Sequence, residues 1–175
     1  MNAEYLFGIF YVIMGTVMFM SRWMKIIGIV CLLLCGCAKK DLVTIKSEQL
    51  IKQTSYLQTS AYVHVEVNLM EISDEVYRYH VVFNQPNVNI DDFKALVITD
   101  DATQTTIPSI GLYDNDKCNL YIDKIDRENN YYEGVSLMGL TTQNQVRCLI
   151  YLSGVVDGET FEEYLCLEES LYDAS

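Results

Sequence analysis

The chain has 175 residues, a formal net charge of −12 and a composition that is 50% hydrophobic. A surface this acidic repels phosphate backbones, so the composition argues against a nucleic-acid partner. The part of the chain that follows the N-terminal segments has a natural length for one domain and leaves no room for two.

Residues 1–23 contain an apolar run over residues 5–20. Two interpretations of this run are open. In the first, translation begins at Met20 or Met24, and the earlier residues are an upstream extension that is never made. In the second, the run is an extra membrane segment, slightly shorter than the ~17–25 residues usual for a spanning helix. The basic residue Arg22 then lies on the cytoplasmic side.

Residues 24–36 have the layout of an export signal. Lys25 precedes an unbroken apolar run over residues 26–34, which is too short to span a bilayer, and small residues follow. The sequence Leu34-Cys35-Gly36-Cys37 resembles the lipobox of bacterial lipoproteins. The resemblance implies that Cys37 receives a diacylglyceryl group and becomes the first residue of the mature chain. It places the rest of the protein on the extracytoplasmic face of a membrane.

Residues 37–60 form a polar segment that we expect to act as a lipidated tether. Lysines near an anionic membrane surface favour the headgroup layer by about 1 kcal/mol each. The segment contains Lys39, Lys40, Lys46 and Lys52. Apolar residues over 42–51 leave another interpretation open, in which this part forms a weak amphipathic turn or a first strand.

Apolar and polar residues alternate from Ala61 onward, which predicts a half-buried antiparallel strand over residues 61–70. A second strand over 77–83 ends before Pro86. Further strands are predicted over 93–99, 107–113, 118–125, 134–140, 145–152 and 161–167. Between the last two of these runs, Asp157-Gly158 indicates a hairpin with a type I′ turn, which needs positive φ at both residues.

Short strands, about eight in number and separated by acidic or glycine-containing turns, indicate an all-β domain over residues 61–175. No long helical repeat lies between them. We expect an antiparallel β-sandwich, Ig-like or related.

The folded domain contains three of the cysteines, Cys118, Cys148 and Cys166. The strand alternation points Cys118 and Cys148 inward and Cys166 outward. Two interpretations are open: a disulfide between Cys118 and Cys148, as exported proteins allow, or buried thiols that act as small hydrophobic side chains. No paired cysteine or histidine motif indicates a metal site.

The inventory of catalytic residues is small. The two histidines, His64 and His80, both lie within predicted strands, and no motif of a known catalytic centre occurs. Glu162 and Glu168 flank the last strand, and paired carboxylates across a cleft can hydrolyse glycans. Charged ends of an exposed strand explain them more simply. We therefore expect that the protein is not an enzyme, with a carboxylate-based hydrolase as an alternative.

Acidic residues in the loops between predicted strands are candidate calcium ligands, because calcium takes several hard oxygen donors. These residues are Asp91, Asp92, Asp100, Asp101, Asp114 and Asp116. Their spacing matches no EF-hand loop, and Asp is common in turns because it tolerates turn geometry. Apart from the covalent lipid on Cys37, we expect no cofactor, with calcium as the alternative.

The 13 tyrosines are a high number for this length. The alternation points several of them outward, namely Tyr62, Tyr121, Tyr151 and Tyr164. Tyrosine is a good strand former, but it also suits interfaces because it joins a large ring to a polar tip. Tyr131 and Tyr132, at the edge of a polar loop, are our candidate contact patch.

These features indicate a membrane-anchored lipoprotein that acts as a binding module for a protein or a cell-envelope component. An alternative is an exclusion or immunity lipoprotein, which blocks a phage component or a secreted toxin at the membrane. The neighbouring genes distinguish the two.

Overall fold

The computed structural model describes residues 41–101, 104, 106–113 and 116–171. The chain divides into two units, Met1–Lys39 and Lys40–Ser175, and the described residues all belong to the second. The predicted upstream extension, the signal segment and Cys37 lie outside the described residues. Among the helices of the described part, none is long and apolar enough to cross a membrane.

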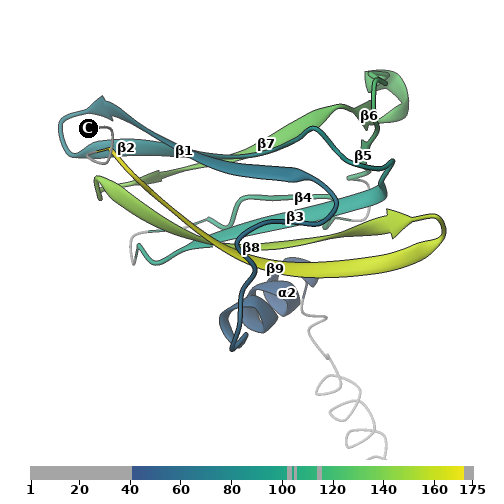
Figure 1. The fold of residues 1–175 in the computed structure, drawn as a ribbon. Helices are drawn as coiled ribbons and strands as arrows, with labels where there is room; N and C mark the ends of the chain where they lie inside the picture. The colour runs from purple at the N-terminus through teal and green to yellow at the C-terminus, as the bar shows by residue number, and fades with distance from the viewer. Residues whose placement is uncertain (1–40, 102–103, 105, 114–115, 172–175) are drawn as a thin grey trace, which may run out of the picture. The chain divides into compact units, whose positions relative to one another are not determined.

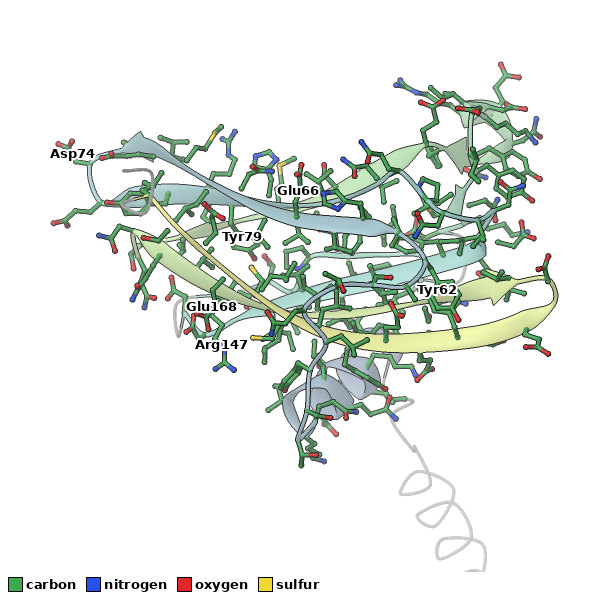
Figure 2. The ribbon with its side chains drawn as sticks, in the orientation of Figure 1. Tyr62, Glu66, Asp74, Tyr79, Arg147 and Glu168 are labelled. Carbon is green, nitrogen blue, oxygen red and sulfur yellow. The ribbon has the colours of Figure 1, made fainter. Side chains whose placement is uncertain are left out.

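The first sheet contains three antiparallel strands in the order β1-β2-β7 (Figure 1). They are β1 (His64–Ser73), β2 (Val76–Asn84) and β7 (Gly134–Thr141). Alternate residues of β2, namely Tyr79, Val81 and Phe83, are fully buried. Tyr79 points into the space between this sheet and the next (Figure 2). The buried face that the alternation predicts for this strand is confirmed.

The second sheet contains four strands in the order β4-β3-β8-β9. They are β3 (Asp91–Thr99), β4 (Ser109–Ile110), β8 (Gln145–Val156) and β9 (Glu159–Ser170). In the hairpin of β8 and β9, Val156 pairs with Glu159. The turn residues Asp157 and Gly158 have φ angles of 53° and 84°. The predicted hairpin is thus confirmed, including the positive φ at both turn residues.

Little regular structure lies between β4 and β7. Two short strands, β5 (Asn119–Leu120) and β6 (Tyr131–Tyr132), pair in parallel, and a short 3-10 helix, η1 (Arg127–Asn129), precedes β6. The strands predicted over 107–113 and 118–125 are therefore far too long. The chain leaves β4 at Gly111, which has a φ of 71° and donates its backbone N–H to the carboxylate of Asp116 at 2.7 Å.

One hydrophobic core takes side chains from both main sheets. For example, the ring of Phe83 in β2 meets the ring of Phe93 in β3 edge to face, with centroids 5.4 Å apart. Both main sheets are antiparallel. The domain is therefore mostly β, as predicted.

A helix, α2 (Leu42–Ile51), packs on the second sheet. Asp41 caps its N-terminus by accepting a hydrogen bond from the backbone N–H of Thr44 at 2.7 Å. Leu50 is fully buried in a second core, beside Leu96 of β3 and Tyr151 of β8. Residues 42–51 are thus a docked helix rather than a free tether, because Val43 and Leu50 pack on the sheet, whereas Ile51 stays exposed.

The prediction that Tyr151 points toward solvent is also corrected. Tyr151 is only 1% exposed, because α2 covers this part of the sheet's outer face. Its hydroxyl donates to the Oγ atom of Ser153 at 2.9 Å, and burial raises the pKa of Tyr151. The hydroxyl is thus a neutral hydrogen-bond donor within the second core.

Of the two interpretations of Cys118 and Cys148, the buried thiols are confirmed and the disulfide is wrong, since Cys118, Cys148 and Cys166 are all free and buried. Cys118 lies beside Phe93 at the start of β3, whereas Cys148 pairs with Thr99 at its end. At 3.3 Å per residue, these two points of a strand are about 20 Å apart, far beyond the ~7 Å limit for bonded cysteines. Burial raises the pKa of both Cys118 and Cys148 to about 12, so these thiols stay protonated.

Candidate binding surface

β5 and β6 lie at one end of the domain (Figure 1). They bring two tyrosine rings together there. Tyr121 follows β5 and Tyr131 begins β6; their ring centroids lie 4.7 Å apart at an interplanar angle of 67°. The Nζ atom of Lys124 lies 3.4 Å from the centroid of Tyr131 and 5.2 Å from that of Tyr121. We call these three side chains the aromatic cluster. The ammonium group sits where the rings attract a cation.

The loop that carries the cluster is built around Asp126. Its backbone exchanges two hydrogen bonds with Tyr131, each 2.9 Å long. Its carboxylate accepts a hydrogen bond from the side chain of Asn129 at 2.8 Å, and this bond lowers the pKa of Asp126. Asn130 ends η1 in the left-handed conformation, with a φ of 61°, which asparagine tolerates better than most residues. These local bonds hold Tyr131 in place beside Tyr121.

Asp91 fixes the hydroxyl end of Tyr121. The phenol donates to the Oδ1 atom of Asp91 at 2.8 Å. This hydrogen bond raises the pKa of Tyr121, because it stabilises the protonated phenol beside a carboxylate. Tyr121 therefore presents an oriented, neutral ring at this end of the domain.

Beside the aromatic cluster lies an open concave surface that encloses a volume of about 610 Å³. Tyr121 belongs to its lining, so the surface and the cluster are continuous. The lining consists of Asn84, Gln85, Pro86, Asn87, Tyr121, Ile122, Asp123, Glu133 and Gly134. None of these lining residues is basic, and amide and carboxylate groups alternate with apolar ones. We call this surface the concavity.

Two features of the concavity are typical of binding sites. The Oδ1 atom of Asn84 is buried and has no hydrogen-bond partner among the described residues. Such an acceptor is costly unless a partner satisfies it. Gln85 and Asp123 both have positive φ angles, 46° and 53°. Backbone strain of this kind often gathers at functional sites.

The structure separates the two residues of the predicted contact patch. Tyr131 belongs to the aromatic cluster, whereas Tyr132 is half-buried and packs against the main core. Both tyrosines are half-buried, so the pair is not fully exposed, and the two rings point apart because adjacent residues of a strand face opposite sides. The residues that the sequence did not single out are Tyr121 as a contact residue, Lys124 and Asn84.

The predicted calcium ligands lie in separate places. Asp91 and Asp92 begin β3, whereas Asp100 and Asp101 follow its end, about 27 Å away at 3.3 Å per residue. Asp101 is buried and accepts hydrogen bonds from Thr141 Oγ1 at 2.6 Å and from the backbone N–H of Thr142 at 3.2 Å.

The two other predicted ligands are Asp114 and Asp116. The carboxylate of Asp116 accepts from Gly111, and Asp114 lies outside the described residues. Within the described ranges, no group of three or more acidic, histidine or cysteine side chains could hold a metal ion.

The carboxylates considered for hydrolysis do not face each other. Glu162 lies 2.6 Å from the Nζ atom of Lys46, and Glu168 lies 3.4 Å from the Nε atom of Arg147; Figure 2 shows the second pair. Along β9 the two glutamates are about 20 Å apart. That exceeds the ~5–9.5 Å between the carboxylates of a glycosidase. Burial alone would raise the pKa of Glu162, but the hydrogen bond from Lys46 brings it below its ordinary value.

The histidines form no catalytic set either. His64 is exposed on β1, 3.6 Å from Glu66. His80 lies on β2, where its Nε2 atom is buried without a hydrogen-bond partner among the described residues. No activated nucleophile lies beside either ring in the described part of the chain, so the concavity is the strongest candidate site.

Comparisons with known proteins do not assign the chain to a family. No protein-family model matches it, and no curated protein matches it. One similar solved structure is the X-ray structure of Northeast Structural Genomics Consortium target SoR45. The TM-score is 0.40 and the identity 11%, over 65% of this chain and 88% of that chain. A similarity of this size indicates neither a shared family nor a shared function.

Proposed function

We propose that the protein is a membrane-anchored, extracytoplasmic lipoprotein that acts as a binding module and binds its partner at the concavity. The lipobox-like sequence at Leu34–Cys37 supports the anchor. The oriented ring of Tyr121 in the lining of the concavity carries the proposal for the site.

The finer fold that we propose is a β-sandwich of the Ig-like or a related type. Two antiparallel sheets that share one core support it. In such a domain, the loops at one end are common binding sites, because a rigid framework positions them. The concavity has this location, since it joins the end of β2 to the loop after β5.

The lining of the concavity indicates the chemistry of the partner. The carboxylates of Asp123 and Glu133 favour neutral or basic groups over anionic ones. The ring of Tyr121 offers a flat apolar surface. We therefore propose a neutral or basic partner, such as a glycan of the cell envelope or a basic segment of a protein.

Binding can be tested with isolated cell-envelope material. The detergent-solubilised protein is mixed with it, and the bound fraction is measured by sedimentation. Tyr121→Ala should weaken binding by about 2 kcal/mol, or ~30-fold, because aromatic anchors contribute this much to an interface. Tyr113→Ala is the matched control, since Tyr113 is 59% exposed and does not line the concavity. Equal binding by both variants would remove the concavity as the site.

Anchoring can be tested at Cys37. Two acyl chains give stable membrane attachment, at about 0.8 kcal/mol per buried methylene group. Cys37→Ser should therefore release the protein from membranes or leave it as an uncleaved precursor, as measured by fractionation and intact mass. Recovery of this variant in membranes at the mature size would show that the anchor is not on Cys37.

A further inference from the structure

The four edge strands of the two main sheets differ in how they are protected. Edge strands expose unpaired backbone groups, and proteins usually protect them with charges, bulges, short length or a covering segment. β4 has only two residues. β1 carries Glu66 and Glu71 and has a bulge near its end. β9 is rich in glutamate, and Leu57 pairs with it at Leu165.

β7 has none of these protections. Its sequence, Gly-Val-Ser-Leu-Met-Gly-Leu-Thr, contains no charged residue and no proline. It pairs with β2 over its whole length without a register shift. No described strand pairs with its other edge. In a chain with a net charge of −12, an uncharged edge eight residues long is unusual.

The outer face of the same sheet is apolar at this edge. Met138 and Leu140 of β7 are 54% and 55% exposed. Across the sheet, Leu140 pairs with Arg78, which in turn pairs with Met70. Met138 pairs with His80. The second sheet differs, because α2 covers its outer face. The apolar residues of the first sheet therefore reach the unprotected edge without a cover among the described elements.

We propose that β7 binds a second copy of this chain by antiparallel strand addition. Two chains that are each strongly acidic repel each other, and β7 is the long edge at which they can meet without bringing like charges together. We place the two-fold axis at Met138. This axis pairs residues of the same face, so the core faces of the two copies' β1-β2-β7 sheets lie on the same side of the joined sheet. Ser136 then lies opposite Leu140 of the second copy, and Met138 lies opposite Met138. The product is a continuous six-stranded sheet with an isologous interface.

Cross-linking of the full-length protein in its membrane tests this register. Directly opposite residues of an antiparallel pair have Cα atoms about 4.5–5.5 Å apart, which suits a disulfide. Met138→Cys should therefore give a disulfide-linked dimer under mild oxidation, many-fold above the unsubstituted chain, whose own cysteines set the background. Met70→Cys is the matched control, because Met70 is 49% exposed on the same face but lies on β1. Equal dimer yields from both variants would overturn the proposal.

The oligomeric state gives an independent test that needs no added cysteine. In sedimentation of the full-length protein in detergent, the unsubstituted chain should be a dimer. Leu140→Asp should shift it to a folded monomer, with a lower melting temperature because the dimer no longer stabilises the fold, since the change places a carboxylate at the neutral edge. Met70→Asp should remain dimeric. A monomeric unsubstituted chain, or a Leu140→Asp variant that stays dimeric, would contradict strand addition at β7.

Discussion

At the scale of the residue, Gly158 isolates the contribution of one backbone angle to stability. A Cβ atom at this position would meet no atom within 4 Å, and the φ angle is 84°. Any cost of substitution therefore comes from the backbone conformation rather than from a clash. The stability cost of replacing Gly158 thus reflects the positive φ angle of this turn residue in the β8–β9 hairpin.

Replacing Gly158 should show this directly. Gly158→Val should lower the free energy of unfolding by more than about 1 kcal/mol, because a β-branched residue is poorly accommodated at positive φ. Gly158→Asn is the control and should cost less, since asparagine tolerates the left-handed region. Denaturant melts of both variants measure the difference. Equal stability of the two would mean that the turn does not have this conformation in solution.

At the scale of the element, the sequence predicts some strands well and others poorly. The alternation from Ala61 finds β1 and β2, and Asp157-Gly158 finds the last hairpin. The alternation does not find β5 and β6 correctly. These strands pair in parallel over only two residues each, and so short a stretch gives no periodic signal.

The prediction from alternation also fails where another element covers the outer face of a sheet. Tyr151 reads as an exposed residue, since alternation shows which residues share a face but not whether another element covers it. The cover is α2, from a segment of the chain that reads as a tether.

The concavity is unpredictable for a similar reason. Asn84 and Tyr121 lie far apart in the sequence, and only the parallel pairing of β5 with β6 places the tyrosine ring beside its partner Tyr131. Of the predicted pair, Tyr131 belongs to the aromatic cluster and Tyr132 packs against the main core. The sequence does not show this difference, because it does not show which face of the short strand β6 meets the core.

The contribution of α2 to the domain can be measured. Leu50→Ala should destabilise the domain by about 2–5 kcal/mol, because it leaves a cavity between the helix and the second sheet. Leu50 has no exposed surface, whereas its neighbour Ile51 is 61% exposed. Ile51→Ala is therefore the control and should change stability by less than about 0.5 kcal/mol. Similar melting curves for both variants would mean that α2 is not docked.

At the scale of the whole molecule, the surfaces of the domain have different properties. α2 covers the outer face of one sheet, β7 offers a neutral edge on the other, and the concavity lies at the end that carries β5 and β6. The concavity borders the β7 edge, because Gly134 both begins β7 and lines the concavity. The charge of −12 keeps nonspecific contacts with other acidic surfaces weak.

The most direct test of the binding-module account is site-specific photocrosslinking in living cells. A photoreactive amino acid is placed at Ile122, which lines the concavity and is 47% exposed, or at Ile51 on α2 as the control. The account predicts a light-dependent adduct of higher mass at Ile122 and none at Ile51. It further predicts that Tyr121→Ala reduces the Ile122 adduct. The absence of an adduct at Ile122, or equal adducts at both positions, would contradict it.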